Sequence, residues 1–220
     1  RTADWREVNS RSELDAAIAA IGLPAILKTT RFGYDGKGQA RIARPESIDE
    51  AWNDLSDGAP LILEAMVPFN HEFSLIAVRD QAGSTVFWDV PENVHKDGIL
   101  ATSAIPPAPV ILEMVPAARG LARRIADRLD YVGVFAIEFF AGPEGPVFNE
   151  MAPRVHNSGH WTIEGAVTSQ FENHIRAVAG LPHGSVALAG ARVEMTNLIG
   201  EAATHWGELM ADMGSHIHLY

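Results

Sequence analysis

The sequence has no cysteine, no long apolar run and no excess of positive charge. Without cysteine, the chain can form neither a disulfide framework nor a thiolate metal site, and a reducing compartment is compatible with it. No apolar run approaches the roughly 20 residues that cross a bilayer, and no signal peptide opens the chain, so we expect a cytoplasmic protein without membrane association. The net charge of −11 argues against a nucleic-acid surface but still allows a small anionic ligand.

The chain is long enough for one large domain or two small ones, since it has 220 residues of which 47% are hydrophobic. Helical and strand patterns alternate, which predicts an α+β fold. Pro68 breaks the pattern, and we therefore predict a small lobe over residues 1–66 and a larger lobe over 67–220. Because the sequence opens with RTADW and stops at HIHLY, we expect a fragment or a trimmed chain.

Local patterns predict the elements of each lobe. Ser10 and Glu13 fit a capping box ahead of a first helix, which Gly22 ends. The other elements expected in the small lobe are strands over 25–29, 39–43 and 61–64 and a helix from Pro45 to residue 55. In the larger lobe we expect strands over 73–79, 85–89, 132–141, 147–150 and 191–198, a helix from residue 109 or 116 to 129, a helix over 168–179, and an irregular polar segment over 91–98.

The segment RFGYDGKGQ, residues 31–39, contains three glycines between two predicted strands. Glycine permits positive φ and a close approach to a ligand, and successive N–H groups in such loops form anion sites. Lys28 and Lys37 bracket the loop, so both could face phosphate oxygens. A flexible hairpin with a solvated lysine is the alternative, and it is the more frequent outcome for glycine-rich hairpins. The order of a Walker loop is missing.

Two carboxylates, Glu138 in FAIEFF and Glu150 in VFNE, lie on strands that we expect to form a hairpin. Such a hairpin can bring both carboxylates to one face, where the Asn149 oxygen would complete a site of the kind that Mg²⁺ prefers together with substrate phosphates. The alternative is an ion pair of Glu138 with an arginine such as Arg154. The pair alone leaves both interpretations open, and the phosphate loop favours the metal.

Polar side chains crowd the segment PRVHNSGHWT, residues 153–162; they are Arg154, His156, Asn157, Ser158 and His160. Arginine can bind a carboxylate or phosphate at two points, and histidine can move protons near neutral pH. A structural polar loop is the alternative. We reject zinc ligation by the two histidines, because neither a cysteine nor a third clustered histidine supports it.

The segment LEAMVPFNHEFS, residues 63–74, places an apolar linker between Glu64 and Glu72. Exposed backbone groups of such a linker could hold a planar base, with a carboxylate on the ribose. Taken alone, the stretch is more often an ordinary exposed turn.

In this order, the segments resemble the ATP-grasp superfamily and, within it, the N5-carboxyaminoimidazole ribonucleotide synthase family of purine biosynthesis. The matching stretches are PAILKTTRFGYDGKGQARI, ENVHKDGIL, VGVFAIEFF and FNEMAPRVHNSGHWTIEGAVTSQFENHIRAVAGLP. The resemblance implies two α+β lobes with a nucleotide bound between them, and a homodimer. It also implies an N-terminal domain ahead of the ATP-grasp part and a basic C-terminal tail, both absent from this chain.

The resemblance implies a nucleotide-binding role for several matching residues. Lys28 would touch the ATP phosphates, Glu72 would bind the ribose, and His95 would lie against the nucleotide. The lid over the phosphates would consist of Gly33, Tyr34, Asp35, Gly36, Lys37, Gly38 and Gln39. The hinge that holds adenine would consist of Glu64, Ala65, Met66 and Val67.

For the chemistry, the resemblance implies that Glu138 and Glu150, with Asn149, hold Mg²⁺, with Mn²⁺ as an alternative. Facing the second substrate and a carboxyphosphate intermediate would be Tyr34, Asp35, Arg154 and His156. The implied reaction consumes ATP, bicarbonate and 5-aminoimidazole ribonucleotide. Carboxyphosphate decomposes in water, so a closing glycine-rich lid fits this chemistry.

Two other functions compete with this one. The first is a different ATP-grasp ligase, of the glycinamide ribonucleotide transformylase or biotin carboxylase type; HNSGHWT and GYDGKGQ argue against it. The second is a nucleotide-binding module without catalysis. The residues that argue against a decayed site are Lys28, Glu138, Asn149, Glu150 and Arg154. We expect the isolated 220 residues to be inactive, because family members use additional segments at both ends.

Overall fold

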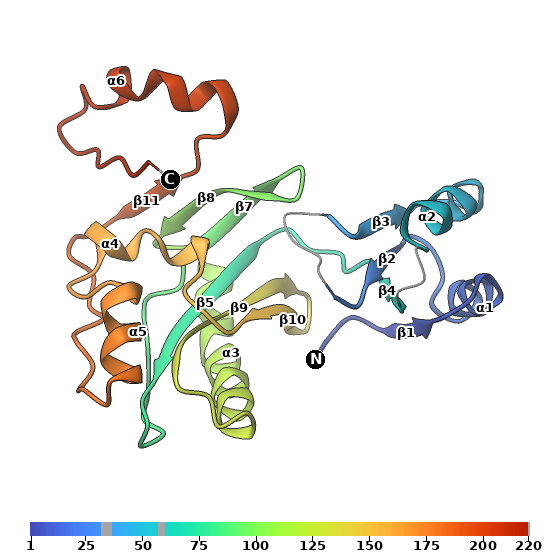
Figure 1. Ribbon diagram of the computed structural model, residues 1–220, viewed down its shortest axis with the longest axis horizontal. Helices are drawn as coiled ribbons and strands as arrows, with labels where there is room; N and C mark the ends of the chain where they lie inside the picture. The colour runs from blue at the N-terminus through green and yellow to red at the C-terminus, as the bar shows by residue number, and fades with distance from the viewer. Residues whose placement is uncertain (32–36, 57–59, 220) are drawn as a thin grey trace. The chain divides into compact units, whose positions relative to one another are not determined.

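The computed structural model describes residues 1–31, 37–56 and 60–219 (Figure 1). Contacts divide the chain into two compact units. The first consists of Arg1–Asn70, Lys96–Ile99 and Phe139–Asn149, and the second of His71–His95, Leu100–Glu138 and the residues from Glu150 onward. The division into lobes 1–66 and 67–220 stays a prediction.

The first unit contains a four-stranded sheet in the order β1-β4-β2-β3. Its elements are β1 (Trp5–Val8), α1 (Arg11–Ile21), β2 (Ala25–Thr29), β3 (Gln39–Ile42), α2 (Ile48–Leu55) and β4 (Leu61–Ala65). The pairings β1–β4, β2–β4 and β2–β3 are antiparallel. The inner face of this sheet forms one core with both helices; among its buried residues are Val8, Leu14, Leu27, Ile42, Ala51 and Leu63.

Local signals set the helix ends of this unit. The Ser10 side chain accepts from the Glu13 N–H, and Gly22, at φ +87°, donates to the Ile18 carbonyl, as the sequence predicts. The Glu13 carboxylate accepts from the N–H of Asn9, one residue before the cap. The predicted helix from Pro45 is wrong in its first turn, because Pro45–Ser47 forms a 3₁₀ turn and α2 begins only at Ile48.

Most of a seven-stranded sheet of order β10-β9-β5-β7-β8-β11, with β6 paired to β5, belongs to the second unit, while parts of β9 and β10 within Phe139–Asn149 are counted with the first. The strands are β5 (Glu72–Arg79), β6 (Thr85–Phe87), β7 (Glu92–Lys96), β8 (Ile99–Ile105), β9 (Gly133–Gly142), β10 (Gly145–Ala152) and β11 (Val193–Thr196). The helices are α3 (Pro109–Arg128), α4 (Thr162–Gly165), α5 (Gln170–Val178) and α6 (Trp206–Leu209), with 3₁₀ turns over Asn157–Gly159 and Gly200–His205.

The expectation of an irregular segment over 91–98 is wrong. Residues 92–96 form β7, and Asp97 and Gly98, with φ +54° and +79°, form a two-residue turn into β8. The sequence of this strand lacks the hydrophobic pattern that predicts a strand, because its buried position is the polar Asn93, whereas Val94 on the other face is 54% exposed.

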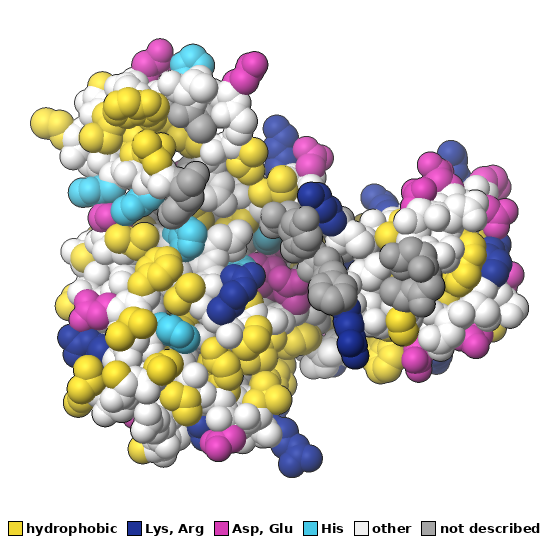
Figure 2. All heavy atoms as spheres, in the orientation of Figure 1, with side chains coloured by type: hydrophobic (Ala, Val, Ile, Leu, Met, Phe, Trp, Pro, Cys, Tyr) yellow, Lys and Arg dark blue, Asp and Glu magenta, His cyan; other side chains and the backbone are white. Residues whose placement is uncertain are grey.

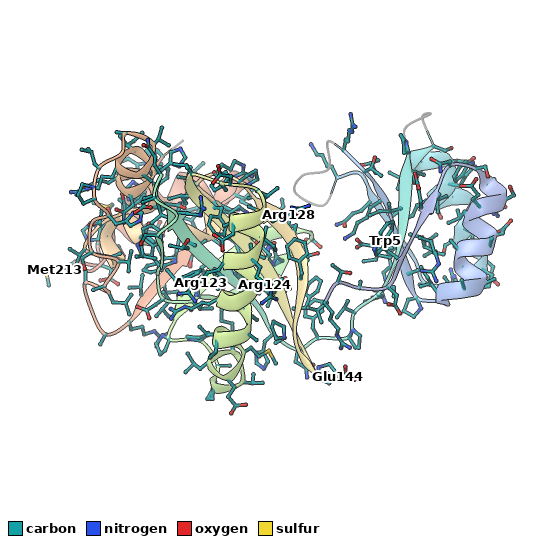
Figure 3. The ribbon with its side chains drawn as sticks, turned by 90° about the horizontal axis from the view of Figure 1, so that it is seen from below. Trp5, Arg123, Arg124, Arg128, Glu144 and Met213 are labelled. Atoms are coloured by element: carbon teal, nitrogen blue, oxygen red, sulfur yellow. The ribbon has the colours of Figure 1, made fainter. Side chains whose placement is uncertain are left out.

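Helix α3 begins at Pro109, the first of the two predicted starts, and continues through Pro116. Its buried side consists of Ile111, Ala118, Ala122 and Ala126. Arg123, Arg124 and Arg128 lie along the same helix in Figure 3, and the Arg123 guanidinium lies 4.8 Å from the centre of the Phe87 ring. Among the described residues, no helix is long and apolar enough to cross a membrane.

Candidate active site

Four strands of the second unit each place one polar side chain on the same face of the sheet. These side chains are Glu72 on β5, His95 on β7, Glu138 on β9 and Glu150 on β10. Residues two or four positions away on β5, β9 and β10 share one apolar core cluster; they are Ile76, Val134, Ala136 and Ala152. The four polar side chains therefore lie on the core face of the sheet, next to the end of its apolar cluster.

His95 lies next to two of these carboxylates. Its Nδ1 is 2.9 Å from Glu72 Oε2, and its Nε2 is 3.9 Å from Glu138 Oε1. Burial favours the neutral ring, but the contact with Glu72 and the charges of Glu138 and Glu150 outweigh it and raise the pKa of His95. The surrounding carboxylates thus favour the protonated form of the His95 ring.

Glu138 has the most perturbed carboxyl of the group. Burial raises the pKa of Glu138 from 4.5 to about 7; the charge of His95 opposes this shift, and the charges of Glu150 and Glu72 add smaller upward effects. Its side chain is only 13% exposed. A divalent cation would offset both the burial and the repulsion from Glu150, so the residues present fit a hard metal ion.

The alternative ion pair with Arg154 does not form. The Arg154 Nη1 donates to the Val155 carbonyl at 2.9 Å, and among the described residues no arginine forms an ion pair with Glu138. Within the same part of the chain, no three His, Asp or Glu side chains are placed to hold a metal by themselves. Two carboxylates would therefore share the ion with oxygen atoms of a ligand or of water, as is usual for Mg²⁺.

The loop over residues 153–162 carries a neutral histidine beside Glu138. His156 Nε2 lies 4.0 Å from Glu138 Oε1, and its Nδ1 lies 2.8 Å from the Ser158 hydroxyl. Burial, followed by the charges of Arg154, His160 and His95, lowers the pKa of His156 to about 4. At neutral pH the ring is therefore an uncharged hydrogen-bonding group. His160, further along the loop, has its ring 5.7 Å from Phe171, and Asn157 accepts from the Ser158 N–H.

In the first unit, Lys28 and Glu64 form an ion pair with Nζ and Oε2 2.6 Å apart. The register of β2 against β4 places Ile26 opposite Glu64, and Lys28 is two residues further along the same face. Each side chain is 24% exposed, so both can reach a ligand. The Thr29 N–H donates to the Gly38 carbonyl at 2.8 Å, which brings Lys28 to the base of the glycine-rich loop.

Of the predicted lid residues, Gly33, Tyr34, Asp35 and Gly36 lie outside the described residues, whereas Lys37, Gly38 and Gln39 are described. In the predicted hinge, the N–H of Ala65 donates to Asp4 and that of Met66 to Pro24. Both donors are therefore used inside the protein, and Val67 is half-buried. Asn149 precedes the exposed Glu150 on β10 and is half-buried.

Two buried polar groups near these residues were missed from the sequence. In one, Asn93 donates to Ser74 at 2.5 Å and accepts from Ser103 at 2.8 Å, which joins β5, β7 and β8 on the face that carries Glu72 and His95. The alternation in ENVHK, with a DG turn after it, was a usable signal. The other group is centred on Gln170.

Cavities of about 450 Å³ along Thr2–Glu7 and about 360 Å³ beside α3 are not lined by any predicted site residue.

Comparisons with known proteins identify the family of the chain. The ATP-grasp domain family matches residues 1–171. An N5-carboxyaminoimidazole ribonucleotide synthase from Pseudomonas aeruginosa is 49% identical over 219 residues, which cover 100% of this chain and 59% of that protein. The chain thus spans about three-fifths of the length of this relative.

Solved structures give the same result. A synthetase of this name in complex with ADP has a TM-score of 0.91 at 41% identity, covering 100% of this chain and 58% of the other. The synthase from Aspergillus clavatus, in complex with ADP and 5-aminoimidazole ribonucleotide, has a TM-score of 0.86 at 31% identity, covering 97% and 57%. The chain therefore belongs to the ATP-grasp family.

Proposed function

We propose that the protein containing this chain is an ATP-dependent carbon–nitrogen ligase. It carboxylates 5-aminoimidazole ribonucleotide with bicarbonate to give N5-carboxyaminoimidazole ribonucleotide, ADP and phosphate, in purine biosynthesis. The observation that carries the proposal is the carboxylate pair Glu138–Glu150 on one sheet face, with Glu138 buried enough to keep its proton to about pH 7. The similarity to synthases over the whole chain supports the choice of substrate.

Each unit offers residues for the nucleotide. Lys28 would bind phosphate oxygens and give up part of its contact with Glu64, while Glu72 would bind the ribose hydroxyls beside His95. The lid 33–39 and the hinge 64–67 are proposed to close on the phosphates and to hold adenine. Because the N–H groups of Ala65 and Met66 are already used, we assign the hinge contact with adenine to the N–H of Val67.

Glu138 and Glu150, with Asn149, are proposed to hold Mg²⁺, with Mn²⁺ as an alternative. The ion, when bound, neutralises charge on the phosphates that would otherwise repel the incoming oxygen. The protein supplies two oxygen ligands and a dry wall, since Glu138 is largely buried. Phosphoryl transfer needs little more than this positioning and charge neutralisation.

Arg154 and His156, with Tyr34 and Asp35, are proposed to face the second substrate. A bicarbonate oxygen attacks the γ-phosphorus and ADP leaves; the carbon of carboxyphosphate then passes to the exocyclic amine, phosphate leaves, and the amine loses a proton. Because the pKa of His156 is about 4, its ring is a weak base, and we assign it to orienting the substrate by hydrogen bonds. Arg154, which is exposed, is suited to bind the phosphorylated intermediate.

The resemblance further supports a cytoplasmic homodimer, and both points are proposals. A different ATP-grasp ligase or a non-catalytic nucleotide-binding protein would keep the fold and lose the response to the second substrate. We expect the isolated 220 residues to be inactive.

Phosphate release by the full-length protein tests the proposal. With Mg-ATP and bicarbonate, 5-aminoimidazole ribonucleotide should stimulate release severalfold, and Glu150→Gln should abolish most of it by removing a metal ligand. Glu113→Gln, an exposed change on α3, is the matched control and should behave as wild type. Stimulation by glycinamide ribonucleotide or biotin instead, or release that ignores every acceptor, would contradict the proposal.

A further inference from the structure

The amide of Gln170 binds the backbone of the loop that carries His156. Gln170 is the first residue of α5, and its side chain is fully buried. Its Nε2 donates to the His156 carbonyl at 2.7 Å, and its Oε1 accepts from the His156 N–H at 3.0 Å. One side chain thus supplies the pair of hydrogen bonds that a neighbouring strand would otherwise give.

The same residue fixes the loop at its other end. The backbone N–H of Gln170 donates to the Thr162 hydroxyl at 2.9 Å, and that hydroxyl donates to the Gly159 carbonyl at 2.6 Å. A Cβ at Gly159 would lie 2.6 Å from Gln170 Oε1, so the loop passes directly over the amide and leaves no space. Residues 156–162 are therefore held at both ends by one residue of α5.

Another buried amide on this helix makes the same kind of contact elsewhere. Asn173 is also fully buried; its Oδ1 accepts from the Gly184 N–H at 2.7 Å, and its Nδ2 donates to the Gly184 carbonyl at 3.3 Å. Gly184 lies in a segment without any candidate site residue. The opposite side of α5 is apolar and exposed, with Phe171, Ile175 and Val178 at the surface. Figure 2 shows hydrophobic side chains gathered over the lower left of the molecule.

We propose that Gln170 is the positioning residue of the loop that binds the second substrate. Gln170 fixes the backbone of His156 at both its N–H and its carbonyl. The ring then lies with its Nδ1 next to the Ser158 hydroxyl and its Nε2 toward Glu138. Arg154 lies two residues before His156 in the chain. This inference takes the identity of the substrate, 5-aminoimidazole ribonucleotide, from the proposed function. The contacts of Gln170 do not depend on that function.

The test compares Gln170→Leu with Asn173→Leu in the full-length protein. Each change removes one buried amide that contacts the backbone twice, so both should lower the urea midpoint to a similar extent. Only Gln170→Leu should lower kcat/KM for 5-aminoimidazole ribonucleotide, by about 10- to 100-fold, as displaced binding groups do. Its KM for ATP should change less than about twofold. An equal loss for both nucleotides, or an equal loss in Asn173→Leu, would overturn the proposal.

Gly159→Ala keeps the amide and displaces it, which provides a second variant should Gln170→Leu fold poorly. It should reproduce the selective loss. Adding Gln170→Ala makes space for the new methyl group but also removes the anchoring amide, so the double variant should remain impaired if the amide positions the loop. A double variant as active as wild type would therefore contradict the proposal.

The positions of the imidazole resonances give a readout that does not depend on activity. In nitrogen-correlated NMR spectra, Gln170→Leu should shift the ring signals of His156, and Asn173→Leu should leave them in place. If the wild type shows no response to the aminoimidazole nucleotide, the proposed function fails while this spectrum still decides the positioning role. Unshifted His156 signals in Gln170→Leu would exclude that role.

Discussion

Replacing Glu138 with glutamine should stabilise the metal-free protein above neutral pH. Burial and the charges of Glu150 and Glu72 raise the pKa of Glu138 from 4.5 to about 7. Below pH 4.5 the carboxyl is neutral in both the folded and the unfolded state. As the pH rises to 7, the unfolded chain loses this proton while the folded protein keeps it, so the free energy of unfolding falls. At about 1.36 kcal/mol for each pKa unit, the full loss is about 3 kcal/mol.

Urea denaturation in EDTA at pH 5 and pH 8 measures this effect. Glutamine does not titrate, so the free energy of unfolding of Glu138→Gln, relative to that of wild type, should be about 2–3 kcal/mol higher at pH 8 than at pH 5. Glu113→Gln is the control and should follow wild type. Mg-ATP should then stabilise wild type and not Glu138→Gln, because one metal ligand is missing. Parallel pH dependence in wild type and Glu138→Gln would refute the assignment of Glu138 as a buried, strained carboxylate.

Three further substitutions have defined outcomes. Lys28→Met should raise the KM for ATP about 10- to 100-fold in steady-state assays, since a charged hydrogen bond to phosphate contributes ~1.5–3 kcal/mol, and an unchanged KM would exclude phosphate contact. Gly133→Ala should lower the free energy of unfolding by about 2 kcal/mol or more, because φ is +118° and a Cβ would lie 2.8 Å from the His174 ring. The control Gly22→Ala, at φ +87° with no atom within 4 Å of the added Cβ, should lower the free energy of unfolding by only about 1 kcal/mol. Arg79→Met should lower it by about 1–3 kcal/mol, since the buried Nη1 donates to the Tyr131 carbonyl at 2.8 Å; a loss under half of this would show that water replaces the guanidinium.

The sequence predicts those elements of the fold whose signals are local. The cap at Ser10, the stop at Gly22 and strand β2 follow from neighbouring residues, and the structure confirms them. Strand β1 was not predicted, because its exposed residues show no alternation and it is defined by pairing with β4. Strand β7 was read as irregular because its buried residue, Asn93, is polar and finds its partners only when the sheet forms.

The candidate site divides in the same way. The hairpin that carries Glu138 and Glu150 could be predicted from the sequence, since a short turn joins β9 and β10, and in the structure the charge of Glu150 acts on Glu138. The contact of Gln170 with His156 joins α5 to a loop 14 residues earlier in the chain, and no hydrophobic periodicity in the sequence predicts it. Predicting it would have required knowing that His156 has no strand beside it to satisfy its backbone.

The central claim is that bicarbonate takes the phosphoryl group of ATP, and oxygen-18 bicarbonate tests it most directly. With Mg-ATP and 5-aminoimidazole ribonucleotide, mass spectrometry of the phosphate released by the full-length protein should find one bicarbonate oxygen in each molecule. The label arrives because carboxyphosphate breaks between carbon and the bridging oxygen when the carbon is transferred to the amine. Released phosphate without label would contradict the account, because water or another acceptor would then have attacked ATP.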